Sequence, residues 1–457
     1  MGIIIDSDRT SVGSAYMNEY EKEYAGKGKC MKKFMTIWIG ELISCIGSGM
    51  TAFALSIYVY ELTKSVTYVS IVTLLAYMPS ILLSPLGGVL ADRYDRRLMM
   101  ILGDLLSGLG LVYMLLMLQL GSNSMAPILI GVTINSVFVA LLEPSYKATV
   151  TDLLTEEEYA KASGLVQLAG NAKYLISPAL AGLILSVADI RVILCLDIMT
   201  FFITVTAVAI VRKTIKKPIE HKKFKGFIQE MKVGFDFLKG DKGILALVFI
   251  MTLICFFLGF VQTLVVPMIL AISNAKNVGI VESISAMGMV VGSIAIGVRG
   301  IKKNHLSILM LTTIICGIFM ALMGVKNNIY FIGVMTFMFF MMLPFMNTCA
   351  DVLVRVSIPN KLQGRVWGMI SLITQFGTVI AYASCGVLAD RIFEPMLAEN
   401  GILAGSVGRM IGVGEGRGIG LLLIISGIGM IAAALIIGNS KNVRTIQVKN
   451  TRIENGE

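Results

Sequence analysis

Histidine and cysteine are scarce in this chain of 457 residues, and the patterns in which they act as ligands are missing. There are two histidines, and the seven cysteines are scattered and odd in number. A metal centre needs several such ligands close together, so we expect no metal site. His-Glu-x-x-His, Gly-x-Ser-x-Gly and Walker sequences are also absent. These absences argue against an intramembrane enzyme and against direct drive by ATP, and we expect no cofactor.

Charge is sparse as well: 15% of the residues are charged and 56% are hydrophobic, which is typical of a polytopic membrane protein. A helix needs about 20 apolar residues to cross the hydrocarbon layer. The first half of the chain contains six such stretches, at residues 34–60, 69–90, 99–120, 126–143, 163–187 and 192–211. The second half contains six more, at residues 243–270, 280–298, 306–325, 328–350, 367–388 and 418–438. The sequence therefore predicts an all-α membrane protein with twelve transmembrane helices.

The net charge of +10 comes from basic residues in alternate loops. With the N-terminus in the cytoplasm, cytoplasmic segments hold 31 of the 39 lysines and arginines, and external loops hold seven. This bias predicts that both termini are cytoplasmic. It also accounts for the basic charge, so we expect a lipid bilayer around the chain and no nucleic-acid partner.

The twelve spans form two sets of six. We expect a cytoplasmic tail at residues 1–33, helical bundles at 34–211 and 243–438, a cytoplasmic linker with an amphipathic helix at 212–242, and a cytoplasmic tail at 439–457. An offset of 204 residues takes Gly164 to Gly368 and Gly182 to Gly386, in the fifth and eleventh spans. The offset supports two pseudo-symmetric halves, an arrangement that places a substrate site between them near the membrane midplane.

The loop between the second and third spans is short and cationic. Topogenic charge alone would explain its arginines, but neither Gly88 nor Asp92. The segment resembles the signature loop of the major facilitator superfamily, Gly-x-Leu-Ala-Asp-Arg-x-Gly-Arg-Arg/Lys. Asp95 stands where that pattern has glycine, as in the subgroup of macrolide-efflux and enterobactin-exporter proteins. The residues of this chain that match the signature-loop pattern are Gly88, Asp92, Arg93, Arg96 and Arg97.

The resemblance implies a twelve-helix transporter whose signature loop forms an inner gate. In the family, the acid of this loop contacts the start of the eleventh span, and the arginines pair with nearby acids. Here these residues would be Asp92 and Arg96. A carboxylate at a helix N-terminus gains about 0.3–1 kcal/mol from the helix dipole.

The fifth span carries a second family-like sequence. It resembles the antiporter motif Gly-Pro-x-x-Gly-Gly, with serine and alanine at two of the glycine positions. Proline would kink the helix there, and the small residues would allow close packing, which ordinary helix contacts also require. The motif favours export moderately, and its matching residues are Ser177, Pro178, Ala181 and Gly182.

A charge inside a span costs roughly 2.5–3.5 kcal/mol at the bilayer centre, and we single out four such residues as candidates. Glu41 is our first candidate for proton coupling and Lys173 the second, although a static ion pair between them is equally compatible with the sequence. We expect Asp104 to partner the arginine loop and Asp197 to reach water by snorkelling. Further polar residues that could line a cavity, or bond between helices, are Asn135, Gln262, Asn347 and Gln375.

These observations predict a monomeric secondary transporter in the bacterial cytoplasmic membrane. Proton-coupled efflux of a small amphipathic compound, such as a drug, a macrolide or a siderophore-like molecule, is the leading hypothesis. Import or uniport of a specific metabolite is the alternative within transport. A membrane sensor that uses the same scaffold without moving its ligand is the alternative outside it.

Overall fold

The computed structural model describes residues 8–121, 124–154, 158–213, 227–301, 304–359 and 362–438, with side chains from residue 31 onward apart from a few positions. All regular structure in this part of the chain is helical. The first half contains α1 (Asp8–Thr63), α2 (Val66–Arg93), α3 (Arg96–Gln119), α4 (Ala126–Leu153), α5 (Tyr159–Leu175), α6 (Ser177–Leu185) and α7 (Ile190–Lys213). The second contains α8 (Phe227–Gly240), α9 (Lys242–Leu270), α10 (Ala275–Arg299), α11 (His305–Met323), α12 (Ile329–Ser357), α13 (Gln363–Leu388), η2 (Ala389–Phe393), α14 (Glu394–Leu397), α15 (Gly408–Ile411) and α16 (Arg417–Gly438).

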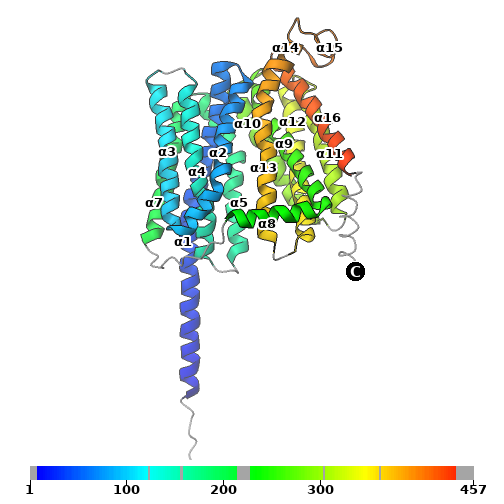
Figure 1. The fold of residues 1–457 in the computed structure, drawn as a ribbon. Coiled ribbons are helices and arrows are strands. Elements are labelled where there is room, and N and C mark those ends of the chain that lie inside the picture. Colours follow the sequence, from blue (N-terminus) through cyan, green and yellow to red (C-terminus); the bar gives the residue numbers. More distant parts are fainter. Residues whose placement is uncertain are drawn as a thin grey trace, which may run out of the picture.

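Twelve helical segments of the described chain are long and apolar enough to cross a membrane, which confirms the predicted number of spans. They form two halves of six, with α5 and α6 together making the fifth span. Figure 1 shows the spans side by side, with α8 lying across one end of the bundle and α14 and α15 projecting from the other. We call these the linker end and the lobe end, the lobe being residues 398–416.

Several spans extend beyond their predicted bounds, and the fourth and fifth differ in ways that affect the packing of the first half. α4 continues to Leu153, ten residues beyond the predicted end. The fifth span breaks at Ile176, because Pro178 has no amide hydrogen and cannot continue the hydrogen-bond ladder of α5. The break is one residue long, because Ile176 keeps a right-handed helical conformation between the two helices. It frees the amide of Ala179 to bond outside its own helix.

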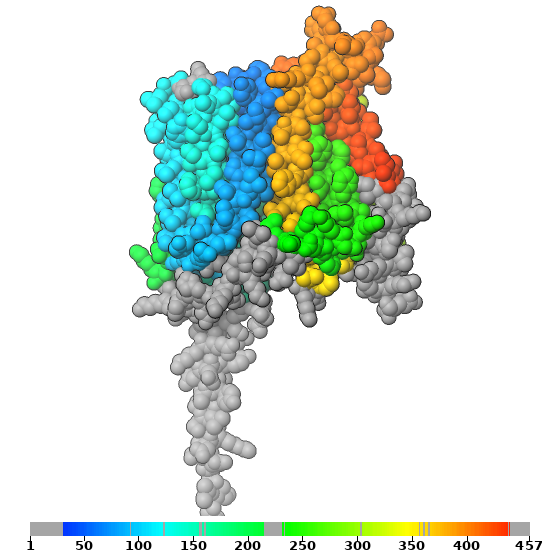
Figure 2. Space-filling model, viewed as in Figure 1, coloured from blue at the N-terminus to red at the C-terminus, as the bar shows by residue number. Residues whose placement is uncertain are grey.

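The segment between the halves, where we expected an amphipathic helix, contains the 14-residue helix α8. Leu238 is buried and Met231 is half-buried, whereas Lys232, Asp236 and Lys239 are exposed. The helix packs against the linker end of α13 and contacts α9. Figure 2 shows α8, in green, across the foot of α13, and the orange lobe rising at the opposite end.

Close helix crossings hold the first half together, and the one between α3 and α4 is centred on two glycines. A Cβ atom added to Gly110 would lie 2.3 Å from the carbonyl oxygen of Gly131, which no real Cβ tolerates. Between apolar helices in lipid, such contacts replace the hydrophobic driving force that water supplies to soluble proteins.

Replacing Gly110 with alanine is expected to destabilise the protein by about 1–3 kcal/mol, because the two backbones must move apart. The thermal unfolding midpoint of the purified protein in detergent should fall. Gly170→Ala is the matched control, since a Cβ at Gly170 meets no atom within 4 Å. An equal midpoint for the two variants would contradict the role of this crossing.

Candidate transport pathway between the halves

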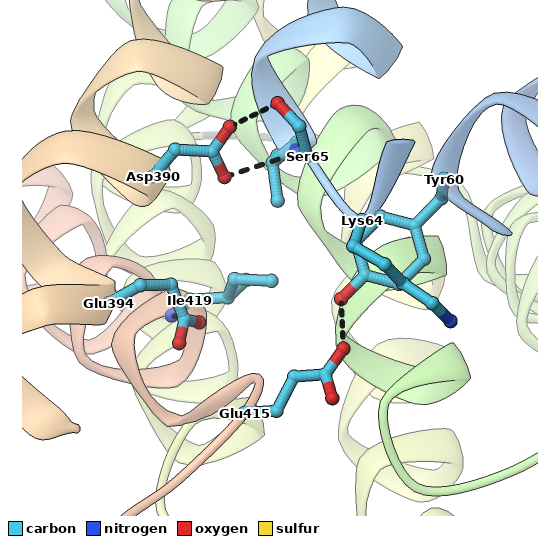
Figure 3. A pocket seen from close by; sticks show the side chains of 8 residues that line it. Tyr60, Lys64, Ser65, Asp390, Glu394, Glu415 and Ile419 are labelled. Atoms are coloured by element: carbon cyan, nitrogen blue, oxygen red, sulfur yellow. Dashed lines mark hydrogen bonds between the residues drawn. The ribbon is translucent and has the colours of Figure 1, made fainter. Parts of the chain in front are cut away.

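The first seam between the halves joins α2 and α13 at the lobe end. Asp390 accepts hydrogen bonds from the hydroxyl of Ser65 at 2.5 Å, the amide of Val66 at 3.0 Å and the amide of Thr67 at 2.8 Å. Figure 3 shows this carboxylate turned toward the first turn of α2. One helix turn nearer the centre, a Cβ at Gly386 would lie 2.6 Å from the Cα of Thr67. The helices touch here backbone to backbone.

The second seam joins α6 and α10, also at the lobe end. A Cβ at Gly279 would lie 2.2 Å from the carbonyl oxygen of Pro178 and 3.2 Å from the Cα of Gly182. The amide of Ala179 donates to the hydroxyl of Ser283 at 3.0 Å. The antiporter-like sequence therefore forms the face of α6 that meets the other half. Ser177 also ties α6 to α1 by donating to the carbonyl of Ile46 at 2.9 Å.

Glycines near the linker end of these spans make no such close contact. A Cβ at Gly88 of α2, Gly164 of α5, Gly297 of α10 or Gly368 of α13 would meet no atom within 4 Å among the described residues. The glycine pairs related by the sequence offset thus behave alike: Gly182 and Gly386 are packed tightly at the lobe end, whereas Gly164 and Gly368 face open space. The described residues thus show close backbone contacts between the two halves at the lobe end and none at these four glycines of the linker end.

Polar and aromatic side chains from both halves meet near the middle of the α2–α13 seam. The hydroxyl of Tyr77 bonds to the side-chain oxygen of Gln375, and the ring of Tyr77 packs edge-on against Tyr382 at 5.5 Å between centroids. Tyr382 in turn donates to Gln262 at 2.6 Å. Two of the four predicted cavity residues, Gln262 and Gln375, therefore lie in one cluster that spans the halves. Sequence reasoning missed both tyrosines.

The other two predicted cavity residues lie elsewhere. Asn135 donates to the carbonyl of Ser107 at 3.3 Å and so bonds α4 to α3 within the first half. Asn347 is exposed on α12. For Asn135 the alternative of a helix-packing hydrogen bond is the one observed.

A cavity of about 530 Å³ lies at the lobe end, beside the Asp390 contact. Its acidic residues are Asp390, Glu394 and Glu415, and Tyr60 donates to Glu415 at 3.3 Å. Figure 3 shows the two contacts, Asp390 with Ser65 and Glu415 with Tyr60, on either side of this space. Both join the first half to the second, so the cavity is bounded by groups that hold the lobe end closed.

Three carboxyl side chains lie inside the first half: Asp104 on α3 and Asp197 on α7 are buried, and Glu41 on α1 is half-buried. Asp104 is 1% exposed, and neither of its oxygens has a hydrogen-bond partner among the described residues. One oxygen of Glu41 also has none, and the other is 3.8 Å from the sulfur of Cys45. Asp197 is 1% exposed and accepts from the hydroxyls of Ser48 and Thr200, both at 3.4 Å. Asp104 lies within electrostatic range of the other two carboxyls.

This geometry corrects several predictions from the sequence. Asp104 does not partner the arginine loop, because it is buried among helices. Asp197 does not snorkel to water, because hydroxyl groups on α1 and α7 solvate it inside the protein. No ion pair joins Glu41 to Lys173 in the described part of the chain. Lys173 instead packs against α1 at Gly49 and lies within electrostatic range of Asp197.

The cationic loop at the linker end is held by acids of its own half. Arg96 pairs with Asp152 at 2.6 Å, and Arg212 pairs with Asp95 at 2.7 Å. Asp95 also caps α3 by accepting from the amide of Arg97 at 3.1 Å. Its φ of −60° does not require the glycine that the family pattern has here. Asp92 lies in the last turn of α2, and its side chain is outside the part that the structure describes; Arg93 is exposed.

Sequence reasoning missed three charged residues. Glu282 is half-buried on α10, next to the Ser283 of the second seam. Arg417 precedes the predicted twelfth span by one residue, yet it is 2% exposed, and it donates to the carbonyl of Gly324 at 2.6 Å. Asp390 lies just beyond the predicted end of the eleventh span and was not among the candidate residues. Glu282 had a signal that could have revealed it, a lone carboxyl inside an apolar run. Asp390 had another, because residues 386–391 repeat the sequence of residues 88–93.

Comparison with known proteins agrees with this architecture. Residues 37–382 match the family model described as Major Facilitator Superfamily. Macrolide efflux protein A of Streptococcus pyogenes is 28% identical over 367 residues, which cover 79% of this chain and 90% of that protein. The enterobactin exporter EntS of Shigella flexneri is 24% identical over 157 residues, which cover 34% of this chain and 38% of EntS.

Solved structures share the fold at low sequence identity. The transporter PepTSo of the POT family superposes with a TM-score of 0.70 at 12% identity, covering 91% of this chain and 98% of PepTSo. A bacterial homologue of the iron transporter ferroportin, in its inward-facing state, gives a TM-score of 0.66 at 11% identity, covering 90% of this chain and 99% of the homologue. With its twelve spans, its signature loop and a family match over most of its length, the chain belongs to the Major Facilitator Superfamily of membrane transporters.

Proposed function

We propose that the chain exports a small amphipathic compound in exchange for protons. The observation that carries the proposal is Asp104, whose buried carboxyl has no hydrogen-bond partner among the described residues. A carboxylate without donors is costly away from water, and a bound proton removes that cost. Glu41, with one unpartnered oxygen, is the second proton-carrying group of this site, and Asp197 completes it.

In this proposal the linker end faces the cytoplasm, because most lysines and arginines lie in the loops at that end. Both termini are then cytoplasmic, and the arrangement described above is open to the cytoplasm and closed outside. A compound enters from the cytoplasm or the inner leaflet. Rocking of one half against the other then opens the lobe end. The working unit in this proposal is a monomer in the bacterial cytoplasmic membrane.

The substrate class is inferred from the midplane cluster and from the relatives. Tyr77 and Tyr382 offer aromatic faces, and Gln262 and Gln375 offer amides, which suits a compound with both apolar and hydrogen-bonding surfaces. Relatives named for macrolide and enterobactin export support a compound of this kind. The signature loop, with Asp92, Arg93, Arg96 and Arg97, acts as the inner gate.

The test is transport into inside-out vesicles that contain the purified chain. We expect a panel of macrolides, cationic dyes and a catecholate siderophore to include at least one compound that accumulates when the vesicle interior is acid. Accumulation should collapse on addition of a protonophore. Empty vesicles give the background. Accumulation of one compound that resists the protonophore would reject proton coupling, and binding without movement would favour the sensor hypothesis.

A further inference from the structure

The N-terminus of α2 depends on the other half of the molecule for its cap. The first amides of a helix have no partner within it, and a side chain at the N-cap position usually accepts from them. In α3, α9 and α12 this residue is the helix's own Asp95, Asp241 and Asn328. The N-cap of α2, Ser65, makes no such bond, and its hydroxyl donates to Asp390 instead.

Asp390 thus takes the place of the missing cap, although it lies 324 residues beyond Val66 in the sequence. It accepts two backbone amides of α2 and the Ser65 hydroxyl, and its negative charge lies at the positive end of the α2 dipole. The bond geometry exists only while the lobe end is closed, because it joins the two halves directly.

The sequence around this acid occurs twice. Residues 386–391 and residues 88–93 are both Gly-Val-Leu-Ala-Asp-Arg. The first copy ends α2 at the linker end, and the second ends α13 at the lobe end. α13 also lacks a side-chain cap, because its N-cap residue is Leu362. Each helix of the seam therefore has an uncapped N-terminus and carries an acid at its far end.

We propose that Asp390 is a positioning residue that holds the lobe end shut by capping α2, and that its bond is exchanged for the Asp92 contact with α13 when the linker end closes. The inference rests on the proposed function, since it assumes that both ends open in turn. It adds to the signature-loop gate a second acid, on the opposite side of the membrane, with an opposite effect on the equilibrium between the two access states.

The test measures access from each side in a chain whose native cysteines are replaced by alanine or serine. Gly368→Cys reports on the open linker end, and Ser283→Cys reports on the closed seam between α6 and α10. A charged maleimide that does not cross the bilayer is added to inside-out vesicles for the first reporter and to intact cells for the second. The readout is the ratio of the lobe-end labelling rate to the linker-end rate.

Asp390→Asn should raise this ratio about tenfold, because the amide lacks the charge and can accept through only one atom. Ser65→Ala, which keeps the acid and removes one of its donors, should raise the ratio by about two- to threefold. Asp92→Asn should lower it. Asp241→Asn is the matched control: Asp241 caps α9 with two amide bonds inside one half, so the ratio should not change.

An unchanged ratio in a folded Asp390→Asn protein, judged by its size-exclusion profile, would overturn the proposal. If that variant does not fold, an unchanged ratio in Ser65→Ala overturns it equally. The measurement needs neither substrate nor proton gradient. A shifted labelling ratio without any transport would therefore support the capping role of Asp390 and reject the proposed export function. Transport with an unshifted ratio would support export and reject the capping role.

Discussion

Asp104→Asn is expected to abolish proton-driven accumulation of substrate in inside-out vesicles, with a loss of at least about tenfold. Asparagine has the same size as aspartate and so should fit the buried site, but it cannot take up and release a proton. Downhill movement of the same compound, without a gradient, should continue, because the side chain lies in the interior of the first half and not at the seam. Measuring both modes in one preparation separates coupling from folding.

Two companion variants complete this test. Glu41→Gln should show the same loss, since both groups belong to the proposed proton site. Asp189→Asn changes an acid that is about half exposed and paired with Arg191, and it should leave accumulation intact. Full gradient-driven accumulation by Asp104→Asn would eliminate this residue as the coupling group, and retention by both variants would reject proton coupling through the first half.

Gly279→Leu is expected to block turnover by preventing closure of the lobe end. Even the Cβ of the new side chain would lie 2.2 Å from the carbonyl oxygen of Pro178, so α6 and α10 cannot reach their observed distance. Forcing extra carbon atoms into a packed contact costs about 1–3 kcal/mol or more, enough to change the population of a state roughly 5- to 150-fold. We expect less than about a tenth of wild-type transport, together with faster labelling of Ser283→Cys from outside.

Gly297→Leu is the matched control on the same helix. A Cβ there meets no atom within 4 Å, so external labelling of Ser283→Cys should stay slow. If transport by Gly279→Leu equals that of the wild type, the second seam does not need this close approach for the transport cycle. Equal labelling of the two leucine variants would show that α10 does not open and close at this point.

Most of the fold could be predicted because span length and charge bias are local properties. Twelve apolar runs and the basic residues beside them are enough to count the helices. The irregularity of the fifth span could be predicted from Pro178, because proline disrupts the hydrogen bonds of its own helix. The signature loop gave the family from a few consecutive residues.

The burial and the hydrogen-bond partners of individual charged residues could not be predicted, because they depend on contacts between segments that are distant in sequence. Asp197 appeared near a predicted membrane boundary, but its solvation by Ser48 requires α1 and α7 to lie together. Arg417 appeared to belong to a polar loop, and only the packing of α16 beside Gly324 buries it. Asp390 lies in a sequence that repeats the start of the signature-loop motif. Its role depends on a helix that begins more than 300 residues earlier.

That separation in sequence has a consequence for biosynthesis. At about 5–20 residues per second, roughly 16–65 s pass between synthesis of the start of α2 and synthesis of Asp390. During this interval the amides of Val66 and Thr67 lack the acceptor that they have in the complete chain. The first six spans must therefore insert and pack without the contact that later closes the lobe end. Capping of α2 by Asp390 is accordingly a late step in the maturation of the protein, and one that truncation before Asp390 would prevent.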